Sequence, residues 1–355
     1  MNSIERFYAT IERRPVDRPA AWLGIPSPQA QPGLFAEYGV DNLRELKLAV
    51  GDDFYSVAIP YRSDYSNSIS SAFDWYQDGK VRIAGRTLTA DGCFKNCETA
   101  EDLTFFKWPE PEKYIDPEEC RHLVEQSPED KAVLGVLWST HFQNTCASFG
   151  METALMNMVS NPELVEAVDN RIMDFFLRAN EVFYKAVCGP ASSARKGGRH
   201  LHAVLIGDDV GTQRGLLVSL ALIRRFVIPG CRALVEQAHS YGLKVIYHSC
   251  GSVADAIPDM IEAGVDAIHP IQALAAGMDA ANLRARYGDR VSFCGGVDTQ
   301  QLLVHGAPED VKDKVRELRE LFPTGLIISP SHEAILDDVP PGNIRALFEE
   351  AVRVC

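Results

Sequence analysis

The sequence predicts an α/β fold, a (β/α)8 barrel of the TIM type, and three observations support this expectation. From about residue 200 onward, short apolar runs alternate with amphipathic helical patterns. Strands that are apolar on both faces, each followed by a helix, indicate a parallel sheet covered on both sides. Eight such runs occur in the chain, and eight βα units close into a barrel. A doubly wound open sheet is the alternative, but the chain lacks the Gly-rich phosphate turn typical of that fold.

The expected elements follow from apolar patterning and from residues typical of helix ends. Strands are expected at 20–25, 53–60, 132–138, 202–207, 244–249, 266–271, 291–296 and 325–330. Helices are expected at 161–187, 252–264, 307–322 and 343–354. Ser252 is a candidate N-cap, Gly264 a candidate stop, and Pro308 suits a first helical turn.

The domain organisation reads as one barrel over 1–355. A helical segment over 1–19 precedes the first strand. An insertion over 81–130 interrupts the less regular first half, with a hairpin at 81–92 and a short helix within 109–130.

Composition restricts the class of protein. The 355 residues include 35 Lys plus Arg against 49 Asp plus Glu, a net charge of −14, which disfavours binding to nucleic acid or to anionic membranes. No apolar run approaches a membrane span, and the start lacks a secretory signal. Nine cysteines without a pairing pattern fit reduced thiols. These features suit a soluble, cytoplasmic enzyme, although composition names no substrate.

Polar residues concentrate at one end of the predicted barrel. Six of the eight strands are followed by segments carrying His, Asp, Cys or Gln: 139–144, 207–213, 248–251, 269–272, 295–298 and 329–333. The opposite ends show mainly Gly-Leu or Gly-Val junctions. Because the C-terminal ends of barrel strands share one mouth, this asymmetry predicts an active site there.

His248 and Cys250 are candidate metal ligands. Side chains two apart on a strand point the same way, so both can reach one ion. Zinc binds imidazole and thiolate, and a catalytic zinc site has three protein ligands. His332, after the last strand, is the first choice for the third. The alternatives for that position are Glu333, Cys294 and His269. A neutral histidine beside a small buried cysteine is the other reading of the pair.

Further site candidates follow the other strands. Asp208 and Asp209 either act as a base and substrate clamp or accept hydrogen bonds from loop amides. Asp209 and Glu333 are the candidate catalytic residues. Candidate substrate-binding residues are Asp208, His141, Gln213, Gln272 and Asp298. Gln272 and Asp298 could equally cap the helices that follow them, and His141 could be a satisfied loop histidine.

Several motifs together resemble the uroporphyrinogen decarboxylase superfamily. They are "GDDVGTQRGLLVS", "AHSYGLKVIYHSCGSV", "IHPIQ", "CGGVDTQQLL" and "SPSHEAILDDVPPGNIRAL", and the opening "SIERFYATIERRPVDRPAAWLG" is similar to the start of that family. The resemblance is dense over 205–348 and looser before, and it is greatest to the cobalamin-dependent methyltransferase branch. It implies the same (β/α)8 barrel.

The resemblance also implies chemistry. Decarboxylases of the superfamily carry an Arg-rich segment near the N-terminus, whereas "PAAWLGIPSP" here has no arginine, which disfavours a polyanionic porphyrin substrate. The methyltransferase branch binds zinc through an H-x-C pair, matched by His248 and Cys250, and a later cysteine. His332 stands where that cysteine would be.

The functional hypothesis is therefore a zinc-dependent methyltransferase that exchanges a methyl group with cobalamin carried by a partner corrinoid protein. With His332 in place of cysteine, we expect zinc to act as a Lewis acid on a substrate oxygen or nitrogen rather than to activate a thiol, with Asp209 or Glu333 assisting proton transfer. The alternatives are a metal-free lyase acting on a smaller acid through Asp208 or Asp209, and a non-catalytic binding barrel.

Overall fold

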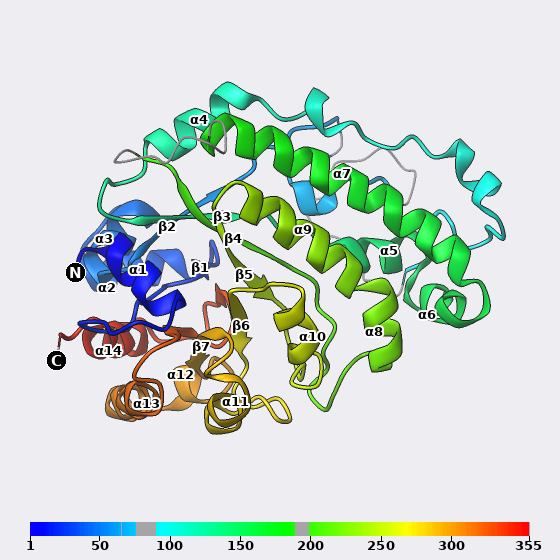
Figure 1. The fold of residues 1–355 in the computed structure, drawn as a ribbon. Coiled ribbons are helices and arrows are strands. Elements are labelled where there is room, and N and C mark those ends of the chain that lie inside the picture. The colour runs from blue at the N-terminus through cyan, green and yellow to red at the C-terminus, as the bar shows by residue number, and fades with distance from the viewer. Residues whose placement is uncertain (65, 76–89, 189–198, 355) are drawn as a thin grey trace.

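The computed structural model describes residues 1–64, 66–75, 90–188 and 199–354. Its centre is a curled sheet of seven parallel strands in the order β2-β3-β4-β5-β6-β7-β8, with helices around it (Figure 1). The strands are β2 Phe54–Ala58, β3 Ala132–Val136, β4 Leu201–Gly207, β5 Lys244–His248, β6 Ala267–Ile271, β7 Ser292–Val297 and β8 Leu326–Pro330. Alternation of parallel strands and helices confirms the predicted α/β, TIM-barrel-like fold.

The predicted strand at 20–25 is wrong as a regular strand. Only Ile25–Pro26 forms a strand, β1, and it pairs with β9 (Ala334–Ile335) in a separate two-stranded sheet. The preceding residues lie against β8, where the Trp22 amide donates to the Ile328 carbonyl at 2.9 Å.

Two features explain why residues 20–25 do not form a regular strand. Gly24 has a φ of +80°, which interrupts the extended conformation. The carboxylates of Asp52 and Asp53 accept hydrogen bonds from the amides of Leu23 and Ala21, at 3.1 and 2.9 Å. Side chains thus take the place of a neighbouring strand for these amides.

The helices confirm most of the predicted boundaries. They are α1 Ser3–Ile11, α2 Gln31–Tyr38, α3 Leu43–Val50, α4 Pro117–Glu125, α5 His141–Phe149, α6 Met151–Ser160, α7 Pro162–Cys188, α8 Leu220–Phe226, α9 Ile228–Ser240, α10 Ile257–Glu262, α11 Ala280–Tyr287, α12 Leu302–His305, α13 Pro308–Leu321 and α14 Pro341–Ala351. The helix expected from Ser252 begins only at Ile257. The Ser252 hydroxyl donates to the Ala276 carbonyl at 2.6 Å and does not cap the helix.

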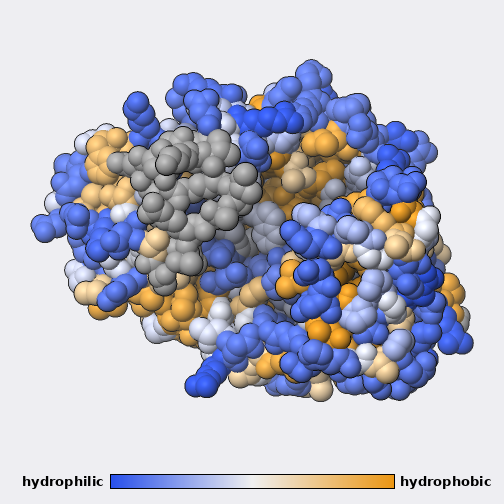
Figure 2. All heavy atoms as spheres, turned by 180° about the vertical axis from the view of Figure 1, so that it is seen from behind, coloured by the Kyte–Doolittle hydropathy of each residue, from blue (hydrophilic) through white to orange (hydrophobic). Residues whose placement is uncertain are grey.

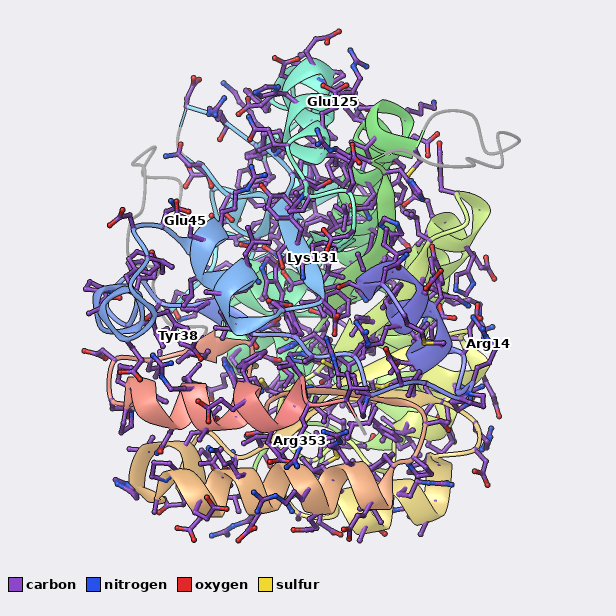
Figure 3. The ribbon with its side chains drawn as sticks, turned by 90° about the vertical axis from the view of Figure 1, so that its left-hand side faces the viewer. Arg14, Tyr38, Glu45, Glu125, Lys131 and Arg353 are labelled. Atoms are coloured by element: carbon purple, nitrogen blue, oxygen red, sulfur yellow. The ribbon has the colours of Figure 1, made fainter. Side chains whose placement is uncertain are left out.

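Helices outside the sheet also pack against each other. Helices α13 and α14 lie side by side below the sheet, and Arg353 follows the end of α14 (Figure 3).

The predicted hairpin at 81–92 falls mostly on residues outside the described ranges, and 109–130 contains the short helix α4. On the face seen in Figure 2, hydrophobic residues lie in small groups among hydrophilic ones. Among the helices that the structure describes, none has the length and apolarity needed to span a membrane.

The interior of the sheet is a separate small hydrophobic cluster. On β4, Ala203 and Leu205 belong to this inner cluster, whereas Val204 and Ile206 face the helices. Phe7 of α1 also joins the inner cluster and packs edge-on against Phe54, the first residue of β2, with ring centroids 5.3 Å apart. Helix α1 therefore packs against the N-terminal ends of the strands.

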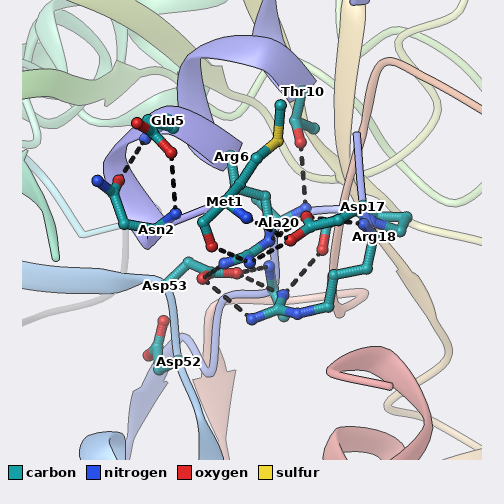
Figure 4. A network of polar contacts seen from close by, with 12 residues as sticks. Met1, Asn2, Glu5, Arg6, Thr10, Asp17, Arg18, Ala20, Asp52 and Asp53 are labelled. Atoms are coloured by element: carbon teal, nitrogen blue, oxygen red, sulfur yellow. Dashed lines mark hydrogen bonds and ion pairs between the residues drawn. The ribbon is translucent and has the colours of Figure 1, made fainter. Parts of the chain in front are cut away.

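A buried ion-pair network ties α1 to β2 (Figure 4). The Asp53 carboxylate is fully buried and accepts hydrogen bonds from Arg6 Nη1 at 2.8 Å and from Arg18 Nη1 at 2.7 Å. Arg6 also binds Asp17 through Nε and Nη2, at 2.8 and 2.9 Å. One carboxylate thus serves two guanidinium groups that have little contact with water.

We predict that Asp53→Asn lowers the free energy of unfolding by about 3–5 kcal/mol, because it removes the buried counter-charge of Arg18 and one of the two carboxylates that bind Arg6. Urea unfolding followed by circular dichroism measures the change. Glu110→Gln, which removes an exposed ion pair with Lys113, is the control and should cost less than about 1 kcal/mol. Equal losses in the two variants would contradict the proposed role of the network.

Candidate metal centre

The ends of three strands lie side by side at the candidate site. Gly207 of β4 pairs with His248 of β5, and His248 pairs with His269 of β6. Gly207 has a φ of +152°, and a Cβ there would lie 1.9 Å from the His248 carbonyl oxygen. Glycine is therefore required for β4 and β5 to approach this closely. The chain then continues directly into Asp208 and Asp209.

Asp209, His248 and Cys250 form a compact group of donor atoms. His248 Nε2 lies 3.4 Å from Cys250 Sγ and 3.2 Å from Asp209 Oδ1. One donor atom from each residue lies within 4.8 Å of the others. Tetrahedral zinc with bonds of about 2.0–2.3 Å places its ligand atoms roughly 3.4–3.6 Å apart. The spacing and the chemistry of the three donors therefore fit zinc.

Asp209 is oriented by two further groups. The Cys250 amide donates to Asp209 Oδ1 at 2.9 Å, and Gln143 Nε2 donates to Oδ2 at 3.3 Å. Gln143 lies on α5 and was not among the predicted site residues. It falls in the polar segment 139–144 that follows a predicted strand, but only the packing of α5 against the end of β4 shows that it reaches Asp209.

His332 approaches the same cysteine from the loop after β8. It hydrogen-bonds with Cys250, and its Nδ1 accepts a hydrogen bond from the Ala334 amide at 3.0 Å. The imidazole is 39% exposed, and its centroid lies 6.4 Å from that of His248. The structure thus brings His332 to Cys250, whereas Asp209 takes the place nearest to both His248 and Cys250.

The other nitrogen of His248 faces a second group. His248 Nδ1 lies 2.8 Å from His269 Nδ1 and 3.6 Å from Glu333 Oε2. Trp138, a non-glycine residue with a φ of +47°, packs edge-on against the His248 ring at 5.2 Å between centroids. His248 is therefore enclosed on several sides, with each nitrogen facing a different set of partners.

Electrostatics in the cluster favour the anionic forms of the candidate ligands. Burial opposes charge on Cys250, yet hydrogen bonds with His248 and His332 lower the pKa of its thiol. Burial likewise opposes charge on Asp209, but His248 lowers the pKa of this carboxyl to about 2. Burial disfavours a charged His248, whereas the hydrogen bonds to Asp209 and Cys250 raise its pKa well above the ordinary value. Metal ions bind the deprotonated forms of cysteine, aspartate and histidine, so a metal ion at these residues would take the place of the His248 Nε2 proton.

Asp208 and His141 are not among the donor residues of the compact group, and their role in binding substrate stays a prediction. Both are fully buried. Asp208 Oδ1 accepts a hydrogen bond from the Gln143 amide at 2.9 Å, and Oδ2 lies 3.5 Å from His141 Nε2. His141 Nδ1 lies 2.8 Å from Asp169 of α7, a residue that sequence reasoning missed. The bond from the Gln143 amide matches the alternative in which Asp208 accepts from backbone amides, whereas His141 begins α5 and its Nε2 is buried without a hydrogen-bond partner among the described residues.

The other predicted residues divide between the cluster and local structure. Gln272 Oε1 accepts a hydrogen bond from the Gly251 amide at 2.6 Å, beside Cys250. The Asp298 carboxylate accepts from the amides of residues 300–302 and so caps the following turn. Gln213 is exposed, with its carbonyl bonded to the Ala276 amide. Cys294 lies in the inner hydrophobic cluster and is not a ligand candidate in this structure.

The buried His141 predicts a pH dependence of stability. Burial disfavours its charge, but Asp169 and Asp208 raise the pKa of His141 from 6.5 to about 9. Burial raises the pKa of Asp208 to about 7. Both folded-state values lie above the unfolded ones, so the stabilisation from each proton is complete at low pH and is lost as pH rises through these values.

We therefore expect the free energy of unfolding of the wild type to decrease as the pH rises from 6.5 to 9.5. In His141→Gln the decrease over the same range should be smaller, by up to about 3 kcal/mol. Urea unfolding of both proteins across this range is the measurement. An identical pH profile in the wild type and the variant would show that His141 carries no extra proton in the folded state.

Comparison with known proteins was made against families, curated sequences and solved structures. The family described as "Uroporphyrinogen decarboxylase (URO-D)" matches residues 117–354. A solved structure described as "methyltransferase from Methanosarcina mazei" aligns with a TM-score of 0.69 and 16% identity, covering 99% of this chain and 98% of that chain. At this identity the likeness is one of fold. The search of curated proteins gives no match. Because the family match spans well over half of the chain and includes the strand ends that carry Asp209, His248, Cys250 and His332, the chain belongs to the uroporphyrinogen decarboxylase family.

Proposed function

We propose that this protein is a zinc-dependent methyltransferase that moves a methyl group between a small methylated substrate or thiol and a corrinoid protein. The observation that carries the proposal is the cluster itself. The ends of β4 and β5 contribute Asp209, His248 and Cys250 to one compact group, and His332, after β8, interacts with Cys250 beside it. A solved methyltransferase with the same fold supports the reaction class.

The proposed zinc ligands are His248 Nε2, Cys250 Sγ and His332. Asp209 is the competing third ligand, since its Oδ1 lies 3.2 Å from His248 Nε2. Bound at these residues, zinc would supply a Lewis acid for the substrate heteroatom to which the methyl group is attached. With three protein ligands, one coordination position remains for substrate.

The remaining carboxylates of the cluster are the proposed proton-transfer groups. Glu333 Oε2 is buried and has no hydrogen-bond partner among the described residues, yet it lies 3.4 Å from His332 Nδ1. A carboxylate oxygen placed in this way can accept or return a proton as the heteroatom changes its charge. Asp209, ionised and exposed along part of its side chain, can serve the same purpose from the other side.

The surroundings favour this proposal over the two alternatives. A metal-free lyase would use Asp208 or Asp209 as its acid, but Asp208 is enclosed by α5 and Asp209 has a pKa of about 2. An ionised carboxylate cannot donate a proton. A non-catalytic barrel would have no need to leave Glu333 Oε2 and His269 Nε2 buried without hydrogen-bond partners among the described residues, because unmatched buried polar groups lower stability.

We expect protein purified under reducing conditions to bind zinc at about one ion per chain. His248→Ala with Cys250→Ala should abolish binding, which elemental analysis after dialysis measures. Cys294→Ala, which removes a buried cysteine of the neighbouring strand β7, is the matched control and should retain zinc. A metal-free wild type would end the zinc proposal.

The third ligand is assigned by a second pair of variants. If His332 binds zinc, His332→Ala should weaken zinc binding by about ten-fold or more, and Asp209→Asn should weaken it less. The reverse order assigns Asp209 as the ligand.

We predict that the zinc-loaded protein, with a corrinoid protein in the reduced cobalt state, demethylates small methyl ethers or methylamines. The formation of methylcobalamin, followed by absorbance, reports the transfer. Glu333→Gln should slow this step while zinc stays bound, because the amide cannot pass a proton to the oxygen or nitrogen that loses the methyl group. Methyl transfer to small thiols, without demethylation of any ether or amine, would contradict the Lewis-acid role.

A further inference from the structure

The second nitrogen of His248 leads to a further inference, which rests on the zinc site proposed above. We propose that His269 is a positioning residue. Its Nδ1 accepts a hydrogen bond from the Nδ1–H of His248, which keeps the lone pair of His248 Nε2 directed at the metal.

The geometry identifies the acceptor. His248 Nε2 faces Cys250 and Asp209, so a metal bound there leaves the ring proton on Nδ1. His269 Nδ1 lies 2.8 Å from that nitrogen, within hydrogen-bond distance, whereas Glu333 Oε2 lies at 3.6 Å, beyond it. Between two facing nitrogens one must donate, and His248 is the ring with the available proton. His269 Nδ1 is therefore the acceptor.

The surroundings of His269 suit a neutral ring. The residue is fully buried, and Nε2 has no hydrogen-bond partner within the described part of the chain. The ring packs at a steep angle of 66° against Trp22, with centroids 5.3 Å apart. A charged imidazolium at this position would lose its hydration without gaining a hydrogen bond on Nε2.

A histidine acceptor has a chemical consequence for the metal. Metal-binding histidines usually donate their second N–H to a carboxylate, a carbonyl or water, and a carboxylate raises the basicity of the ligand. A neutral imidazole raises it less, so His248 donates less electron density and zinc stays more electrophilic. Because His269 accepts the hydrogen bond from His248 Nδ1–H, the Glu333 carboxylate remains available for proton transfer.

Nitrogen-15 NMR of histidine-labelled wild-type protein tests the assignment directly. We expect His269 to carry its proton on Nε2, with Nδ1 unprotonated, both with and without zinc. His202 is an internal reference, because its Nδ1 accepts from the Val133 amide at 2.9 Å and its Nε2 is likewise buried, with no hydrogen-bond partner among the residues that the structure describes. A proton on His269 Nδ1 would overturn the inference. A protein that binds no zinc but shows the expected His269 tautomer would overturn the proposed function and not the hydrogen bond.

Two substitutions separate positioning from packing. His269→Phe preserves the ring but removes the acceptor, and should weaken zinc binding by about ten- to a hundred-fold. His269→Gln loses the ring but supplies an amide oxygen, and should stay within a few-fold of the wild type. His202→Phe, remote from the cluster, should leave zinc affinity unchanged. Competition with a chromophoric chelator measures all four proteins.

The relative zinc affinities of His269→Phe and His269→Gln decide the outcome. A role in packing alone predicts that His269→Phe binds zinc at least as well as His269→Gln, and that result would contradict the inference. Equal affinity of both variants, whether retained or lost, would contradict it as well. If His269→Phe does not fold, the tautomer measured in the wild-type protein still decides.

Discussion

The arrangement of the candidate site depends on the parallel register of β4, β5 and β6. This register places Gly207, His248 and His269 in one row across the sheet. A side chain at Gly207 would collide with the His248 carbonyl, so the row exists only because that position has no Cβ. Every later contact follows from it: Asp209 reaches His248 Nε2 from one side, and His269 reaches Nδ1 from the other.

The two ends of the strands carry different kinds of buried charge. At the N-terminal ends, Asp53 is matched by Arg6 and Arg18, each within hydrogen-bond distance. At the C-terminal ends, the charges of Asp209 and Glu333 face histidines and a thiol, which are also metal ligands. Barrel enzymes commonly divide stability and chemistry between the two ends in this way. The fully paired charges lie at the N-terminal ends of the strands, and the candidate reactive groups lie at the C-terminal ends.

Much of the fold and the centre of the site could be predicted from the sequence. Runs that are apolar on both faces, such as 202–207, identified strands because a covered parallel sheet leaves no polar face. The spacing of His248 and Cys250 predicted their common direction, because side chains alternate along a strand. The segment 20–25 was mispredicted because its amides donate hydrogen bonds to the side chains of Asp52 and Asp53. These two residues lie about 30 positions further along the chain, so a local pattern does not reveal the bonds.

Other features lay beyond sequence reasoning because they arise from tertiary packing. Adjacent carboxylates on extended backbone point in opposite directions, so Asp208 faces α5 while Asp209 faces the cluster. Nothing in the pair itself indicates which one points where. Gln143 and Asp169 come from helices, and their contribution depends on how α5 and α7 pack against the end of β4.

The central claim is that Cys250 and His248 bind one zinc ion. X-ray absorption at the zinc edge of the reconstituted protein tests it most directly. The account predicts one sulfur at about 2.3 Å, with the other ligands nitrogen or oxygen at about 2.0–2.2 Å. It also predicts that the sulfur signal disappears in Cys250→Ala. A zinc shell without sulfur, or with a sulfur that persists in that variant, would contradict it.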